Sequence, residues 1–265
     1  MFKTRLVSGI ILVLVLIALV GHGGYVLLGF LTAVSLIGMY ELYKVVNVQN
    51  KILGFAGYLA SAAYYGLILS GNLKLNTMLS ILFLVLLMAV YVFSFPSYRA
   101  EQVMTVFFGF FYVAVMLSYI YQTRMLEDGG VLVCLIFLSS WGCDTCAYCV
   151  GMLFGKHKMA PKLSPKKSVE GGIGGIAGAA LLGALLALGV NAWAGMSVSP
   201  LYYAVICGVG GAISQVGDLA ASAVKRNHNI KDYGKLIPGH GGILDRFDSV
   251  IFTAPIIYYL ATYLA

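Results

Sequence analysis

One stretch of 27 residues, from Ser222 to Asp248, holds much of the polar chemistry of this chain. It carries five of the 17 Lys and Arg residues, three of the ten carboxylates and two of the four His residues. Cations of this kind bind phosphate oxygens, Lys as a point charge and Arg as a bidentate fork. Carboxylates repel phosphate but suit Mg²⁺, which takes one or two of them and completes its shell with water and substrate phosphates. The stretch therefore predicts a site for a phosphorylated substrate and a divalent metal ion.

The carboxylates are spaced so that they can act together. Asp245 and Asp248 are three residues apart, so they share one face if a helix has begun there. Asp218 precedes Lys225 by seven residues on the preceding helix and could face both of them. We predict that Asp218, Asp245 and Asp248 bind metal, and that these three act in catalysis with Lys225 and Arg246. The alternative is an ion-pair network of Asp218, Lys225 and Arg246 that only joins helices.

A glycine-rich turn lies between the two charged groups. The run Gly239-His240-Gly241-Gly242 can turn sharply and expose backbone N–H groups to an anion. His240 is expected either to donate to a pyrophosphate group or to fix the turn. The substrate-binding residues predicted in this stretch are Ser222, Arg226, Lys231, His240, Gly241 and Gly242.

A second basic segment precedes a glycine-rich helix. Ser164, Lys166 and Lys167 lie in a loop that contains five Lys residues and leads into Glu170 and two Gly residues. Hydroxyl groups, cations and flexible backbone together suit a polyphosphate. We predict that Ser164, Lys166 and Lys167 bind substrate phosphates. The alternative is that the lysines only set membrane topology.

Asp144 lies well inside a predicted apolar helix. Insertion of a carboxylate there costs roughly 2.5 to 3.5 kcal/mol near the bilayer centre. Asp144 and Tyr148 are four residues apart, so both are expected to face a polar cavity, with Asp144 binding substrate or a cation. The alternative is a structural Asp bonded to a neighbouring helix. The nearby Cys143, Cys146 and Cys149 are expected to pack between helices rather than to form a metal or redox cluster.

The composition identifies an integral membrane protein. Hydrophobic residues make up 60% of the 265 residues and charged residues only 10%, against about 25% charged in soluble domains. At about 20 apolar residues per span, nine transmembrane helices are predicted in an all-α fold. The predicted spans cover residues 6–21, 24–41, 53–70, 77–94, 103–121, 130–150, 173–195, 200–222 and 249–264.

Nine spans place 15 of the 17 Lys and Arg residues on one side. By the positive-inside rule this side is cytoplasmic, so the N-terminus is expected in the cytoplasm and the C-terminus outside. The net charge is +7, and the Lys and Arg residues that produce it lie mostly in the predicted cytoplasmic loops. Anionic lipids and nucleotide phosphates are therefore the expected partners, and nucleic acid is not.

The polar residues divide the chain into two regions. Residues 1–125 form a predicted scaffold of about five helices, in which Glu41 and Lys44 are only an ion pair at a helix end. Residues 126–265 form the predicted catalytic region, with cytoplasmic loops at 151–172 and 223–248. Closely spaced Gly residues from 171 to 183 predict tight helix packing and would allow a homodimer.

These motifs resemble the signature of the CDP-diacylglycerol synthases, also called phosphatidate cytidylyltransferases. The segment around residues 164–172 resembles a second characteristic segment of that family, with Val169 where Trp is expected. The Cys residues that flank Asp144 are also unusual. The signature matches at twelve positions: Ser222, Lys225, Arg226, Lys231, Asp232, Pro238, His240, Gly241, Gly242, Asp245, Arg246 and Asp248.

The resemblance implies a membrane-embedded nucleotidyltransferase of phospholipid biosynthesis. The phosphate of phosphatidic acid would attack the α-phosphorus of CTP, giving CDP-diacylglycerol and pyrophosphate. One or two Mg²⁺ ions would assist, and a second, monovalent cation is left open. The resemblance also implies a multi-pass protein of the cell (inner) membrane, surrounded by membrane lipids, with its active site at the cytoplasmic face.

Two other functions share parts of this pattern. A CTP-dependent polyprenol or lipid kinase would use similar basic and acidic segments but would transfer the γ-phosphate. An ion-coupled transporter of an anionic solute would also place acids inside the membrane. Against a transporter, the charges concentrate at one membrane face, whereas a transporter needs a polar path through the protein.

Overall fold

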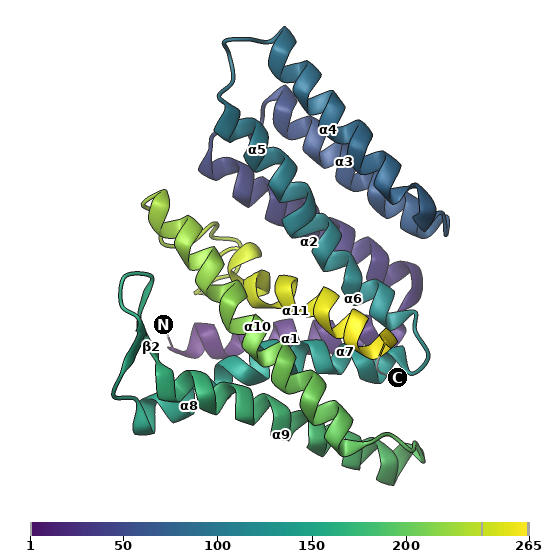
Figure 1. The fold of residues 1–265 in the computed structure, drawn as a ribbon, viewed down its shortest axis with the longest axis vertical. Helices are drawn as coiled ribbons and strands as arrows, with labels where there is room; N and C mark the ends of the chain where they lie inside the picture. The colour runs from purple at the N-terminus through teal and green to yellow at the C-terminus, as the bar shows by residue number, and fades with distance from the viewer. Residues whose placement is uncertain (1, 240, 264–265) are drawn as a thin grey trace. The chain divides into compact units, whose positions relative to one another are not determined.

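The computed structural model describes residues 2–239 and 241–263, and it is nearly all helical (Figure 1). Within these residues, seven helical segments are long and apolar enough to cross a membrane. The chain is therefore a multi-pass membrane protein. The seven segments are Gly24–Val45, Ile52–Leu69, Asn76–Phe93, Ala100–Arg124, Gly129–Phe154, Val169–Ala194 and Pro200–Asn227.

These seven segments overlap seven of the nine predicted spans. The predicted span 6–21 falls in a shorter apolar helix, Ser8–His22, and the predicted span 249–264 falls in α11 (Leu244–Tyr263), which is outside the apolar set. The beginning of α11 is charged because it carries Asp245, Arg246 and Asp248. The count of nine spans stays a prediction.

The described contacts divide the chain into two compact units. The first contains residues 1–121 and 232–246, and the second contains residues 122–231 and 247–265. The sequence had placed residues 232–246 with the second region, but their contacts are with the first. The first unit begins with α1 (Phe2–His22), α2 (Gly24–Val45), α3 (Ile52–Leu69), η1 (Leu73–Leu75), α4 (Asn76–Phe93), α5 (Ala100–Gly109), the π-helical η2 (Phe110–Val115) and most of α6 (Met116–Arg124).

The first unit packs around buried tyrosines. The hydroxyl of Tyr43 on α2 donates to the carbonyl of Val106 on α5 at 2.8 Å. A Cβ at Gly57 would lie 2.4 Å from that hydroxyl, and a Cβ at Gly109 would lie 2.6 Å from the same ring. Only glycine therefore lets α3 and α5 close on Tyr43. The hydroxyl of Tyr65 donates to the carbonyl of Ala114 in η2 at 3.1 Å, so it satisfies a group of the irregular helical turn.

The second unit is built on three closely packed helices, α8, α9 and α10, which lie side by side in Figure 1. A Cβ at Gly174 on α9 would lie 2.6 Å from Val150, and one at Gly178 would lie 2.5 Å from Sγ of Cys146. The predicted tight packing of the glycine-rich helix is thus confirmed. The elements of the second unit are α7 (Gly129–Phe137), the π-helical η3 (Leu138–Gly142), α8 (Cys143–Phe154), β1 (Lys158–Ala160), β2 (Ser164–Ser168), α9 (Val169–Ala194), α10 (Pro200–Asn227) and most of α11.

The packing interpretation of the cysteines is confirmed for Cys143 and Cys146, whereas Cys149 is exposed. Cys143 is buried, and its Sγ lies 3.5 Å from the carbonyl of Gly211 on α10. Cys146 lies against Gly178 on α9. All five cysteines are free thiols.

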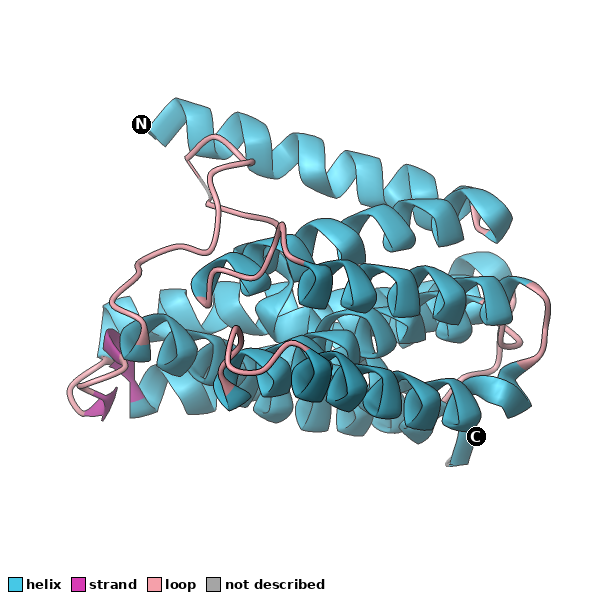
Figure 2. Ribbon diagram, turned by 90° about the horizontal axis from the view of Figure 1, so that it is seen from above, coloured by secondary structure: helices cyan, strands magenta, loops and turns pink. Residues whose placement is uncertain are grey.

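Two loops differ from their predicted extents. Strands β1 and β2, magenta in Figure 2, form an antiparallel hairpin within the predicted loop 151–172. This hairpin is the exception to the all-α prediction. The other predicted loop, 223–248, is shorter because α10 continues to Asn227 and α11 begins at Leu244. Lys225 and Arg226 extend α10 since cations in the last turn of a helix are favoured by its dipole.

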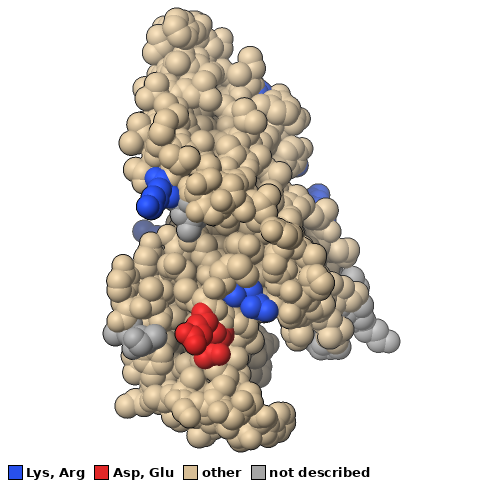
Figure 3. Space-filling view, turned by 90° about the vertical axis from the view of Figure 1, so that its right-hand side faces the viewer, with Lys and Arg blue, Asp and Glu red and all other residues tan. Residues whose placement is uncertain are grey.

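Charged side chains are few on the face drawn in Figure 3, where most atoms belong to neither basic nor acidic residues. Large apolar side chains are instead exposed along the spans, among them Phe93 at 90% and Leu201 at 74%. Such a surface suits contact with lipid tails.

Candidate active site

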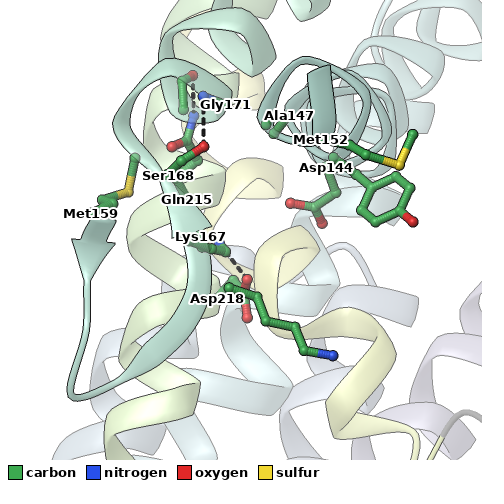
Figure 4. Close-up of a pocket in the computed structure, with 13 residues that line it drawn as sticks. Asp144, Ala147, Met152, Met159, Lys167, Ser168, Gly171, Gln215 and Asp218 are labelled. Carbon is green, nitrogen blue, oxygen red and sulfur yellow. Dashed lines mark hydrogen bonds and ion pairs between the residues drawn. The ribbon is translucent and has the colours of Figure 1, made fainter. Parts of the chain in front are cut away.

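A cavity of about 420 Å³ lies in the second unit, lined by α8, the hairpin, α9 and α10 (Figure 4). Three predicted substrate-binding residues, Asp144, Lys166 and Lys167, line it together with the predicted metal ligand Asp218. The structure therefore brings together side chains that are far apart in the sequence. Its polar lining includes Asp144, Tyr148, Lys166, Lys167, Gln215 and Asp218.

The centre of this cavity is an ion pair between Lys167 on β2 and Asp218 on α10 (Figure 4). About a quarter of each side chain is exposed, 24% for Lys167 and 27% for Asp218. At this depth the pair is less screened than a surface ion pair. Asp218 thus pairs with a lysine of the earlier basic segment.

Asp144 reaches the cavity from α8. This helix follows the π-helical turn η3, a local irregularity that is frequent at functional sites. Tyr148 lies one turn later on α8 and lines the same cavity, so the prediction that the two side chains share a face is confirmed. An acid inside a span is therefore placed beside the Lys167–Asp218 pair.

Asp248 is buried, with 7% of the residue exposed, and its Oδ1 accepts a hydrogen bond from the N–H of Ser249 at 2.8 Å. Its charged neighbours are Asp218, Lys225 and Asp144. A Cβ at Gly217 on α10 would lie 2.9 Å from the carbonyl of Asp248. Glycine at this position therefore allows the close approach that gathers the carboxylates of α8, α10 and α11, with Lys225 as a nearby cation.

The other predicted residues of α10 differ in exposure. Ser222 and Lys225 are half-buried, whereas Arg226 is exposed and its Nη1 lies 3.5 Å from the carbonyl of Ile230. Lys231 follows the helix and is exposed. Arg226 and Lys231 are thus accessible to an anion that approaches from the solvent.

The hairpin is positioned by two residues that the sequence analysis did not single out. Ser168 caps α9 by accepting from the N–H of Gly171 at 3.2 Å. The carboxylate of Glu170 accepts from the N–H groups of Lys156 at 3.1 Å and His157 at 3.2 Å. The pattern Ser-x-Glu-Gly-Gly is typical of a helix start and could have indicated both roles. Lys166 and Lys167 line the cavity, while Ser164 lies at the other end of β2, paired with Ala160.

Gln215 is a further residue of the site that was not predicted from the sequence. Its Nε2 donates to the carbonyl of Gly172 at 2.9 Å, which joins α10 to α9 at the wall of the cavity. A Cβ at Gly172 would lie 2.8 Å from Oε1 of Gln215. Its spacing of three from Asp218 places it on the same side of α10, a signal available in the sequence.

The loop 232–246 belongs to the first unit and is organised by Asp245. Oδ2 of Asp245 accepts from the N–H groups of Tyr233 at 2.8 Å and Gly242 at 3.0 Å. Gly241 has a φ of 87°, a left-handed value that favours glycine. The N–H of Gly242, predicted to face phosphate, thus binds the protein's own carboxylate. Arg246 is half-buried at the start of α11, and the prediction for His240 lies outside the described residues.

Glu41, predicted to belong to the scaffold, contacts this loop. Its carboxylate accepts from the N–H groups of Ile243 at 3.1 Å and Leu244 at 2.9 Å. Glu41 ends the predicted span 24–41, so the argument applied to Asp144 could have indicated it. Glu41 is therefore more than the predicted ion-pair partner of Lys44, because it also binds the backbone of a distant loop.

The predicted metal ligands give a pair of neighbouring carboxylates rather than a complete cage. In the described part of the chain, no group of three or more His, Cys, Asp or Glu side chains is close enough to hold a metal ion. Asp218 and Asp248 are electrostatic neighbours in the second unit. This donor set fits Mg²⁺, which uses one or two carboxylates and takes its other ligands from water and substrate phosphates.

Comparison with known proteins matches nearly the whole chain. A family model described as the cytidylyltransferase family matches residues 3–264. Three similar curated proteins are named phosphatidate cytidylyltransferase. The protein of Staphylococcus epidermidis (strain RP62A) is 32% identical over 268 residues, covering 97% of this chain and 98% of its own. The protein of Bacillus subtilis (strain 168) is 30% identical over 269 residues, with 97% of each chain covered. That of Staphylococcus aureus (strain COL) is 32% identical over 273 residues, with 97% and 98% covered.

Proposed function

The chain belongs to the cytidylyltransferase family, and from this we propose that it is a phosphatidate cytidylyltransferase that converts CTP and phosphatidic acid into CDP-diacylglycerol and pyrophosphate. The observation that carries the proposal is the ion pair of Lys167 and Asp218 in the cavity of the second unit. It joins Lys167, in the second segment that resembles this family, to the predicted metal ligand Asp218 on α10.

The chemistry requires positioning and charge neutralisation rather than a protein nucleophile. An oxygen of the lipid phosphate forms a bond to the α-phosphorus of CTP, and the bond from that phosphorus to pyrophosphate breaks. The attacking phosphate is already ionised near neutral pH because its second pKa is about 6. Two anions must therefore meet while charge builds on the leaving group, which is the usual electrostatic difficulty of phosphoryl transfer.

The residues of the second unit suit these tasks. Lys166 and Lys167 line the cavity and would bind phosphate oxygens, while Lys225 offsets the carboxylates of α10 and α11. Arg226 in the last turn of α10 and Lys231 beyond the helix are exposed and would attract the incoming nucleotide. Asp144 would hold a cation or the polar end of the lipid substrate.

We assign Asp218 and Asp248 as the residues that would hold Mg²⁺. The role of Asp245 as a third ligand stays a prediction from its spacing of three residues before Asp248 on α11. When bound, the ion would neutralise phosphate charge and align the two substrates. Oδ2 of Asp245 already accepts two backbone hydrogen bonds, so its contribution would come from Oδ1. Ser222 and Arg246 would contact phosphate.

The membrane arrangement follows the charge pattern. We propose nine spans with the N-terminus and the cavity on the cytoplasmic side of the cell membrane, where CTP is found. Maleimide labelling of single cysteines at Lys162 and Asn72, in a variant lacking the five native cysteines, tests this arrangement. In sealed right-side-out vesicles an impermeant maleimide should label position 72 and spare position 162, and the reverse pattern would overturn the orientation.

The activity test uses purified protein, phosphatidic acid and CTP labelled at either the α- or the γ-phosphate. Label from the α-phosphate should enter the lipid phase in the presence of Mg²⁺, and a chelator or the substitution Asp218→Asn should abolish the transfer. Transfer of the γ-label alone would replace the proposal with a lipid kinase. Transfer of neither label by folded protein would reject the enzyme proposal.

A further inference from the structure

The carboxylate of Glu41 is buried within the first unit, with only 5% of the residue exposed. A buried carboxylate is tolerated only where hydrogen bonds or opposite charges compensate for lost hydration. The compensation here comes from a distant part of the chain, because its two oxygens accept from Ile243 and Leu244, about 200 residues later in the sequence.

These two N–H groups lie at the beginning of α11, where backbone donors have no partner within the helix. Such donors are normally satisfied by a side chain just before the helix. In this protein a residue from α2 takes that role. The start of α11, and with it Asp245 and Arg246, is thereby fixed to the end of α2.

The loop leaves no room for any side chain beside Glu41. A Cβ at Gly234 would lie 2.1 Å from Oε1 of Glu41, and a Cβ at Gly242 would lie 2.3 Å from the same atom. A Cβ at Gly234 would also lie 3.0 Å from Cα of Gly242. The two glycines let the loop close around the carboxylate from both sides.

Two carboxylates together organise this loop. Glu41 satisfies the N–H groups of Ile243 and Leu244, while Asp245 satisfies those of Tyr233 and Gly242. Asp245 and Lys44 are charged neighbours of Glu41, the first like-charged and the second opposite. Two anions side by side are unfavourable unless both are held by donors, so the loop geometry and the two carboxylates depend on each other.

We propose that Glu41 is a positioning residue for the cytidylyl transfer reaction, which holds the loop 232–246 and the start of α11 in the arrangement that presents Asp245 and Arg246 to substrate. It acts through these groups and does not touch substrate. The inference rests on the proposed function, because the task of the loop is taken from it.

The test compares full-length Glu41→Gln with Glu101→Gln, a matched change at an exposed residue of α5 in the same unit. The amide can accept one of the two hydrogen bonds but turns an NH₂ group toward the other donor. We expect kcat/KM for CTP to fall about 10- to 100-fold in Glu41→Gln and to stay within twofold in Glu101→Gln. Unchanged kcat/KM in folded Glu41→Gln would overturn the proposal.

A second readout separates positioning from general destabilisation. Trypsin can cut at Lys235 inside the loop and at Lys158 and Lys162 in the hairpin, all of which are exposed. Loss of positioning should accelerate cleavage at Lys235 only. Equal acceleration at all three lysines would show a general structural role and overturn the proposal.

A third experiment tests the same contact from the side of the loop. Gly234→Ala alone should lower kcat/KM, because its Cβ meets the Glu41 carboxylate. In a Glu41→Ala background the same change should cause a much smaller further loss, since only the 3.0 Å contact with Cα of Gly242 remains. Equal effects of Gly234→Ala in both backgrounds would overturn the inference. If the wild-type protein forms no CDP-diacylglycerol, the proposed function fails, and cleavage at Lys235 still tests whether Glu41 holds the loop.

Discussion

Lys167 and Asp218 form an ion pair across the cavity of the second unit, between a strand and a helix that are 51 residues apart at these positions. A pair at this depth can serve substrate binding only if its cation can also reach a phosphate. The side chain of Lys167 lines the cavity while its Nζ is buried against Asp218, so a phosphate would have to take the place of this carboxylate. The pair therefore links the hairpin mechanically and electrostatically to α10.

The first prediction concerns this pair. Lys167→Ala and Asp218→Asn should each lower kcat/KM by about 10²-fold or more, because each removes a charge from a preorganised site. The double variant should be no more than about threefold worse than Asp218→Asn, since groups that act as a unit are not additive. Steady-state kinetics with labelled CTP measures both effects. Lys162→Ala, at an exposed position of the same hairpin, is the control. Fully multiplicative losses would show that the two residues act separately.

The second prediction concerns Asp248, which is buried with two other carboxylates and the cation of Lys225 as charged neighbours. Asp248→Asn should abolish Mg²⁺-dependent activity yet raise Tm in the presence of a chelator by about 2 to 4 °C, as expected for about 1 kcal/mol. Thermal unfolding in detergent measures the shift, with Glu127→Gln at an exposed site as the control. A lower Tm for Asp248→Asn would mean that its charge stabilises the fold.

The third prediction concerns helix packing. Gly178→Val should destabilise the protein by about 1 to 3 kcal/mol, because a Cβ at this position would lie 2.5 Å from Sγ of Cys146. Gly189→Val is a matched control on the same helix, since a Cβ there meets nothing within 4 Å. Thermal unfolding of the two variants gives the comparison. Equal stabilities would exclude close contact of α8 and α9 at Gly178.

The fourth prediction concerns the hairpin. Glu170→Gln should loosen it, because the carboxylate accepts from the N–H groups of both Lys156 and His157 and also pairs with Nδ1 of His157. Trypsin cleavage at Lys158 and Lys162 should become about tenfold faster, as local opening becomes easier. Cleavage at Lys235 in the other unit serves as the internal reference. A proportional increase there would indicate general unfolding instead.

The sequence alone determined the class of protein and its helices. Hydropathy over about 20 residues is a local property, so seven of the predicted spans overlap helices that can cross a membrane. The motif residues from Ser222 to Asp248 were sufficient to indicate the cytidylyltransferase family, because their types and spacing can be identified within one short stretch of sequence. The glycine spacing after residue 170 likewise predicted close packing, which is confirmed at Gly174 and Gly178.

The tertiary structure decided which of these residues meet. The sequence placed Lys167 and Asp218 in one site but did not indicate that they pair, and it assigned Glu41 to the scaffold although its carboxylate caps α11 from 203 residues away. The sequence also predicted that the N–H of Gly242 binds a phosphate, whereas in the folded protein it donates a hydrogen bond to Asp245. Such pairings depend on how closely helices approach, which is set at positions such as Gly217 and Gly242 by contacts between distant segments. No local pattern contains that information.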